Sequence, residues 1–116
     1  MKNTTPEQRE RLKNLSEHSQ EWVEGLADIQ LENIESSGLD PRTHSLCRLA
    51  TLVAIDAPVA SYAWQISVAE ESGVTIDDFI GVLIALAPTV GFTRIVAAAS
   101  KLAVLYDIEI DLDQAA

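Results

Sequence analysis

Apolar residues recur every three or four positions along most of this chain, which predicts a series of amphipathic α-helices. The pattern is clearest from Asp40 to Tyr106, where four such segments follow one another. The positions expected to be buried share helical spacing within each segment: Leu46, Leu49, Ala50 and Val53; Val59, Tyr62, Ala63, Ile66 and Ala69; Phe79 to Leu86; and Ile95, Val96, Ala99, Leu102 and Leu105. An all-α fold follows from this pattern.

Capping residues and prolines mark the expected starts of these helices. Asp40 followed by Pro41 predicts one start. Pro58 is expected to be the first residue of the next helix, because proline fits the first helical position. Thr75 with Asp78 three residues later resembles a capping box and predicts a third start.

The end of the chain carries a further break and a change of period. Pro88 to Gly91 is expected to end or kink the third of these helices, and Thr93 to cap the last one. Beyond Tyr106, apolar and acidic residues alternate, which is a strand-like period without a partner strand. We therefore expect residues 107–116 to form an extended acidic tail.

The N-terminal part predicts two more helices. Thr5 followed by Pro6 begins a short, highly charged leading helix within residues 1–15. Ser16 is expected to cap the next helix, which ends near Gly38. Its apolar stripe consists of Trp22, Val23, Leu26, Ile29 and Ile34. At 116 residues the whole chain, 1–116, is expected to be a single domain.

Composition narrows the classes of partner. The chain is 47% hydrophobic with a net charge of −10, and it has no Lys or Arg between Arg48 and Arg94. Without a basic stripe to neutralise phosphates, we expect neither nucleic acid nor an anionic membrane surface as a partner. With only 5% aromatic residues, the apolar positions are mostly Ala, Val, Leu and Ile. They leave more apolar surface than a chain this small easily hides, which favours self-association.

The sequence gives little support for a metal site, for thiol chemistry or for insertion into a membrane. Cys47 is the only cysteine, which excludes an intrachain disulfide, a redox pair and a cysteine-rich zinc site. The series Glu109, Asp111, Asp113 lacks the glycine-shaped loop of a calcium site and is interpreted as a solvated tail. The polar N-terminus and the short uncharged run Phe79 to Thr93 favour a soluble, cytoplasmic protein. We expect no metal and no cofactor.

Two segments resemble the carboxymuconolactone decarboxylase family, which includes alkylhydroperoxidase D-like proteins. They are LDPRTHSLCRLATLVAI, residues 39–55, and SGVTIDDFIGVLIALAPTVGFTRIVAAASKLA, residues 72–103. The resemblance implies an all-α, alkylhydroperoxidase D-like bundle of about six helices around a central helical hairpin. It also implies a homo-oligomer, a trimer or hexamer, with sites between helices.

The resemblance places the family's reactive groups on unreactive residues. Family members of the redox branch carry two cysteines, a histidine and an upstream glutamate. In this chain the matching positions are Pro58 and Ser61 for the cysteines, Gln65 for the histidine, and Ser45 or a neighbour for the glutamate. The family's redox site is therefore degenerate here, although the Gln65 amide can still hydrogen-bond a ligand.

His44, Cys47 and Arg48 form the first candidate site, because spacings of three and four place them on one helical face. In the functional interpretation His44 transfers a proton and Arg48 holds an anionic group. In the structural interpretation Cys47 is half-buried between two surface groups.

Ser61, Trp64 and Gln65 form the second candidate, on the helical turn where the family has its reactive groups. In the functional interpretation Trp64 and Tyr62 roof a small polar pocket, in which Ser61, Gln65 and Ser45 orient a ligand. In the structural interpretation the two aromatic residues belong to the core or an interface.

Two functions remain open at this point. One is chemistry on a small organic molecule, of lactone, decarboxylation or cyclisation type, without redox thiols. The other is a non-catalytic oligomeric scaffold or binding protein. A residual peroxidase activity through Cys47 is the least favoured, because it requires an exposed thiol with a lowered pKa.

Overall fold

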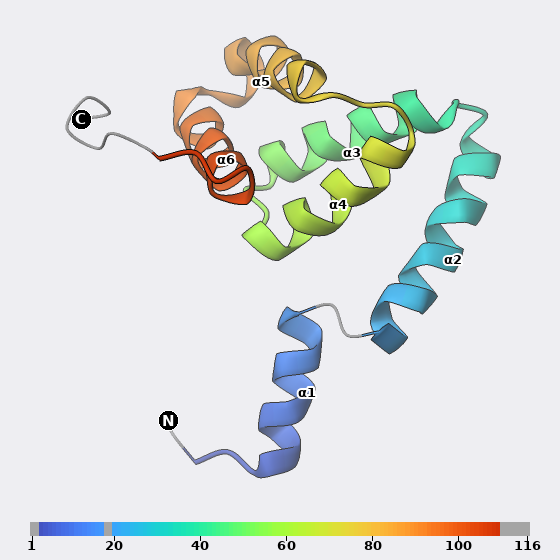
Figure 1. Ribbon diagram of the computed structural model, residues 1–116, viewed down its shortest axis with the longest axis vertical. Helices are drawn as coiled ribbons and strands as arrows, with labels where there is room; N and C mark the ends of the chain where they lie inside the picture. Colours follow the sequence, from blue (N-terminus) through green and yellow to red (C-terminus); the bar gives the residue numbers. More distant parts are fainter. Residues whose placement is uncertain (1–2, 18–19, 110–116) are drawn as a thin grey trace. The chain divides into compact units, whose positions relative to one another are not determined.

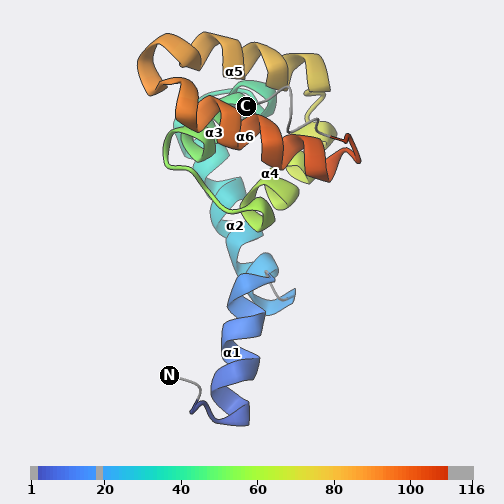
Figure 2. The same cartoon turned by 90° about the vertical axis from the view of Figure 1, so that its left-hand side faces the viewer.

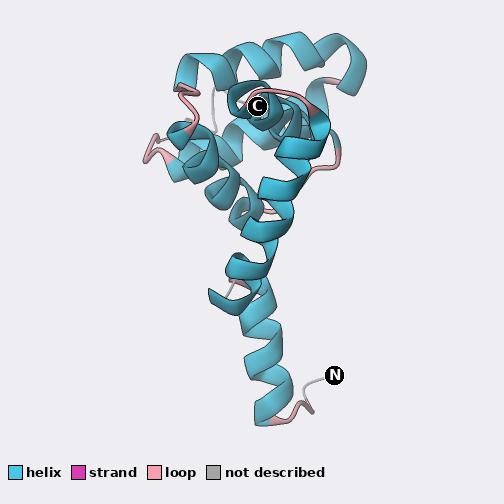
Figure 3. Ribbon diagram, turned by 90° about the vertical axis from the view of Figure 1, so that its right-hand side faces the viewer, coloured by secondary structure: helices cyan, strands magenta, loops and turns pink. Residues whose placement is uncertain are grey.

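The computed structural model describes residues 3–17 and 20–109, with the side chains of 20–27 excepted. Within these residues it consists of helices joined by short loops and contains no strand (Figures 1 and 3). The helices are α1 (Pro6–Ser16), α2 (Gln20–Ser37), α3 (Pro41–Ala54), α4 (Val59–Glu71), α5 (Ile76–Val90) and α6 (Phe92–Leu105). The prediction of an all-α bundle of about six helices is confirmed. None of the described helices has the length and hydropathy that crossing a bilayer requires.

The chain divides into two compact units, residues 1–39 and 40–116. In the first unit, α1 begins with a capping box in which Thr5 and Gln8 bond each other's backbone N–H groups. Ser16 does not cap α2 as predicted. It is the last residue of α1, and its hydroxyl donates to the Lys13 carbonyl at 2.9 Å. Of the predicted α2 stripe, Ile29 is exposed, and the side chains of Trp22, Val23 and Leu26 lie outside the described residues.

In the second unit, α3 packs against α4, α5 and α6. The α3 start follows the prediction: the Asp40 carboxylate accepts from the Thr43 backbone N–H and hydroxyl, both at 2.9 Å, and Pro41 occupies the first turn. These hydrogen bonds to the charged form, the backbone bond first, lower the pKa of Asp40.

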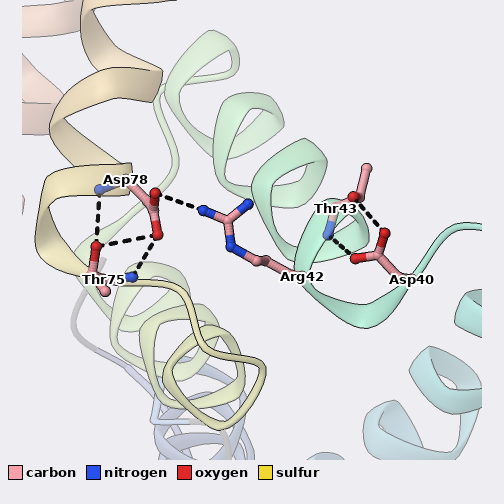
Figure 4. Close-up of polar contacts among 5 residues, drawn as sticks. All are labelled: Asp40, Arg42, Thr43, Thr75 and Asp78. Carbon is pink, nitrogen blue, oxygen red and sulfur yellow. Dashed lines mark hydrogen bonds and ion pairs between the residues drawn. The ribbon is translucent and has the colours of Figure 1, made fainter.

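The start of α5 also follows the prediction and is tied to α3 (Figure 4). Thr75 and Asp78 form a reciprocal capping box, with the Asp78 carboxylate accepting from the Thr75 N–H at 2.8 Å. Arg42 Nη2 lies 2.7 Å from Asp78 Oδ1, so one carboxylate caps α5 and pairs with α3. The Thr75 N–H and Arg42 together lower the pKa of Asp78.

Two predicted boundaries are wrong by one or two residues. Pro58 is the N-cap of α4 rather than its first residue, because its ψ of 161° is extended. Gly91, not Thr93, precedes α6 and also ends α5, with φ 95° and ψ 155°. Pro88 lies inside α5, which continues to Val90.

The core lies wholly within the second unit among the described residues. It gathers Leu49, Val53, Ala57, Tyr62, Ile66, Ala69, Val74, Phe79, Leu83 and Ala98. Lys101 on α6 forms an ion pair and a hydrogen bond with the loop between α3 and α4. Its Nζ lies 2.8 Å from Asp56 Oδ1 and donates to the Ala57 carbonyl at 2.8 Å. The two helices flanking that loop are thereby held against α6.

Candidate functional site

The residues singled out in the sequence lie on α3 and α4, which pack side by side (Figures 1 and 2). Gln65 on α4 is 3% exposed, so the turn that carries it faces the interior of the second unit. Arg48 on α3 is exposed, and its Nε donates to Gln65 Oε1 at 3.2 Å. This hydrogen bond joins a residue from each candidate site and fixes the orientation of the Gln65 amide.

Further polar atoms are buried on the same two helices. Ser45 and Tyr62 are each 1% exposed. None of the described residues supplies a hydrogen-bond partner to Ser45 Oγ, Tyr62 Oη or Gln65 Nε2. A buried donor or acceptor without a partner costs about 1–3 kcal/mol. Each of these atoms therefore has hydrogen-bonding capacity that a polar group in contact with it would use.

His44 lies next to Ser45 on α3 and is buried, at 5% exposure. Its pKa is lowered, chiefly because burial penalises the imidazolium and secondarily because of the positive charge of Arg48. The lowered pKa favours a neutral imidazole near pH 7, which is the form that accepts a proton.

Cys47 differs from the expectation of a half-buried thiol between two surface groups. Cys47 is exposed and His44 is buried, so the two exposures are reversed. The reason is helical geometry. The buried face of α3 runs through Ser45, Leu49 and Val53, and a residue two positions after Ser45 points about 200° away from it.

The remaining candidates on and before α4 differ in exposure. Ser61 and Trp64 are partly buried, and Pro58 is exposed at the helix cap. Tyr62, expected to roof a pocket or join the core, is a member of the core. Burial, followed by the negative charge of Asp56, raises the pKa of Tyr62 to about 12.

Sequence reasoning missed the contacts that hold this region. Arg48 and Gln65 are 17 residues apart, and Lys101 lies 45 residues from Asp56. Helical periodicity could have suggested that Arg48 and Gln65 face each other across an antiparallel pair. Helical periodicity carries no signal for the contact of Lys101 with Asp56.

Among the described residues, no group of three or more His, Cys, Asp or Glu side chains is arranged to hold a metal ion. Asp111 and Asp113 lie outside those residues.

Comparison with known proteins identifies one family. The family model described as "Carboxymuconolactone decarboxylase family" matches residues 19–104, which is most of the chain. The comparisons with curated proteins and with solved structures found no match to this chain. The matched range includes all the residues described above on α3 and α4.

Proposed function

The chain belongs to the carboxymuconolactone decarboxylase family, and from this premise we propose that it holds a small polar organic molecule between α3 and α4. We propose that it acts on this molecule without thiol redox chemistry. The proposed chemistry is of lactone, decarboxylation or cyclisation type. In such reactions a proton is moved to or from a substrate that carries carbonyl or carboxylate groups.

The hydrogen bond between Arg48 and Gln65 carries this proposal. Gln65 stands where the resemblance places the family's histidine, and its Oε1 is occupied by Arg48 Nε. Its buried Nε2 has no partner among the described residues. An amide held in this way offers its N–H groups to a carbonyl or carboxylate oxygen.

The proposed roles of the neighbouring residues follow from their chemistry. Arg48 keeps its terminal guanidinium nitrogens for an anionic group, since only its Nε bonds Gln65. Ser45 offers a buried hydroxyl as donor or acceptor. Ser61 and Trp64, both partly buried on α4, border the ligand on the other side.

His44 is the proposed proton-transfer group. Burial and the charge of Arg48 keep its imidazole neutral near pH 7, so it can take a proton from the ligand. The imidazolium that forms is disfavoured in the same surroundings and returns the proton readily. Cys47 is exposed on α3 and has no role in this scheme.

A binding experiment tests the ligand-holding part. The full chain is purified under mild conditions, and native mass spectrometry measures the mass of any retained small molecule. Gln65→Leu removes both polar ends of the amide at similar volume and is expected to lose the retained molecule. Cys47→Ser is the matched control and is expected to keep it. Equal retention by both variants would contradict the role of Gln65.

A turnover experiment tests the proton-transfer part. A panel of carboxylated lactones and β-keto acids is assayed by loss of substrate. His44→Ala is expected to lower kcat by about 100-fold or more, whereas Cys47→Ser leaves it unchanged. Circular dichroism confirms that each variant remains helical. Full activity in His44→Ala would show that another group moves the proton.

A non-catalytic binding protein is the second candidate, and the identity of Gln65 favours it. An amide does not titrate, so the position of the family's histidine cannot exchange a proton in this chain. This candidate predicts a retained ligand together with no turnover of any panel member. The two experiments above therefore separate the two candidates.

A further inference from the structure

An apolar groove of about 150 Å³ runs between α5 and α6, which lie side by side (Figures 2 and 3). Its lining pairs the beginning of α5, at Ile76 and Ile80, with the end of α6, at Ala103 and Tyr106. The two helices therefore run in opposite directions along the groove. Ile84, one turn beyond Ile80, is 69% exposed and continues the row of isoleucines on α5. Apolar side chains that cover such a groove stabilise the folded state.

The chain itself enters this groove after α6. Asp107 takes a positive φ of 55°, and its N–H donates to the Val104 carbonyl at 3.2 Å. The Ile108 N–H donates to the Ala103 carbonyl at 2.8 Å. This pair of hydrogen bonds is the Schellman motif of a helix end. Ile108 then lines the groove together with Ala103, so the chain has turned back along α6.

The residues that follow Ile108 match the groove in period. In an extended chain, side chains two residues apart share a face and lie about 6.6 Å apart. Ile110 and Leu112 therefore share a face with Ile108 if the chain remains extended. Residues four apart in an α-helix lie about 6 Å apart, which is the spacing of the three isoleucines on α5. Successive apolar residues of the tail can thus meet successive turns of α5.

The charges of the tail also suit this surface. Glu109, Asp111 and Asp113 alternate with the apolar residues, so in an extended chain they share the opposite face. Their carboxylates stay in water when the apolar side chains face the groove. The chain carries a net charge of −10, yet no charged residue occurs from Phe79 to Thr93. An acidic segment therefore meets less like-charge repulsion along α5 than elsewhere on the molecule.

We propose that residues 110–113 of the same chain lie extended in this groove as a strap, with Ile110 and Leu112 against α5. The position of the chain determines this occupant. The last residue that the structure describes is Glu109, which directly follows the groove residue Ile108. No further residues have to span a gap, so the strap acts at high effective concentration. Another apolar molecule has to displace it to reach the groove.

The first experiment measures which side of the tail faces α5, in a Cys47→Ser background that leaves no native thiol. Ile84→Cys is combined with Leu112→Cys in one variant and with Asp111→Cys in the matched control. Under mild oxidation, the variant with Leu112→Cys is expected to form its intrachain disulfide at least about 10-fold faster. A tail that moves freely in solvent brings both positions to α5 equally often, so equal rates would overturn the proposal.

The same variants show whose tail occupies the groove. A preparation labelled with a heavy nitrogen isotope is unfolded together with an unlabelled one under reducing conditions. The mixture is refolded and oxidised, and mass spectrometry reads the isotope content of the linked peptides. A strap from the same chain predicts linked peptides of a single isotope. Peptides of mixed isotope would show that the groove takes the tail of a second copy, which rejects the proposal.

The second experiment measures how well the groove is covered. Nile red, a neutral dye that fluoresces on apolar surfaces, is titrated into the wild type and two double variants. Ile110→Ser with Leu112→Ser removes the apolar side of the strap and is expected to increase dye binding at least about fivefold. Asp111→Ser with Asp113→Ser changes only the opposite side and is expected to bind dye as the wild type does.

Two outcomes of the dye titration would overturn the proposal. One is equal dye binding by all three proteins, and the other is an equal increase in both double variants. Circular dichroism confirms that each protein remains helical. If the variant with both apolar changes loses helix, Leu112→Ser alone replaces it as the milder change, with Asp111→Ser as its control.

Discussion

Tyr62 shows at the scale of one residue how burial in this core changes acid–base chemistry. Its side chain is 1% exposed, and burial followed by the negative charge of Asp56 raises its pKa to about 12. In the unfolded chain a tyrosine ionises near pH 10. The folded state therefore keeps the phenol neutral over a range in which the unfolded state has lost its proton.

This difference predicts a specific dependence of stability on pH. The pKa of Tyr62 is higher in the folded state than in the unfolded state. Its contribution to the free energy of unfolding is therefore fully present below pH 10 and is lost as pH rises through about 12. The free energy of unfolding is expected to fall across this window by on the order of 2 kcal/mol from this residue. Denaturant titrations at several pH values measure the fall.

Tyr62→Phe is the control for this prediction. It removes the titrating group while leaving the ring in the core, so the difference in slope from the wild type isolates Tyr62 from the lysines. The pKa of Tyr106 is also raised, by burial first and then by the charge of Glu70. An identical slope in the wild type and Tyr62→Phe would show that Tyr62 ionises as readily in the folded state as in the unfolded one.

At the scale of the helices, the start of α5 depends on one short polar motif. The Thr75 hydroxyl accepts from the Asp78 N–H at 3.3 Å, and the Asp78 carboxylate returns to the Thr75 N–H. Thr75→Ala is expected to lower the free energy of unfolding by about 1 kcal/mol, whereas Thr75→Ser keeps the hydroxyl and most of the stability. Denaturant unfolding followed at 222 nm measures both. Equal losses in the two variants would mean that the hydroxyl is not what stabilises this end.

The helices also show what sequence patterns determine. The caps at Asp40 and at Thr75 were predictable because their hydrogen bonds span only three residues. The cap of α6 was not. Gly91 takes a backbone conformation that ends one helix and allows the next to begin one residue later, so Thr93 falls inside the first turn of α6.

The candidate site was predictable only in part. Helical spacing placed His44, Cys47 and Arg48 on one face of α3, but it could not tell which of them the neighbouring elements bury. That depends on packing between segments distant in sequence. The same limit applies to the bond between Arg48 and Gln65, which depends on the rotation of two helices about their axes.

At the scale of the whole molecule, the described core residues all belong to residues 40–116, and α1 buries no side chain. A fragment of residues 40–116 is therefore expected to fold alone and to unfold cooperatively on heating. Circular dichroism and calorimetry compare it with the full chain. A fragment that lacks a cooperative transition would show that residues 1–39 are needed for the core to form, and the single-domain prediction would then gain support.

Gly91 has a consequence that depends on the handedness of amino acids. Its backbone, with φ 95° and ψ 155°, lies in a region open almost solely to glycine. Yet among the described residues, apart from Gly91 and its two chain neighbours, no atom lies within 4 Å of where its Cβ would stand. Every L-residue is therefore strained there whatever its size, and even asparagine gains nothing. A D-residue takes positive φ as readily as an L-residue takes negative φ, so semisynthesis with D-alanine is expected to cost less stability at this corner than Gly91→Ala.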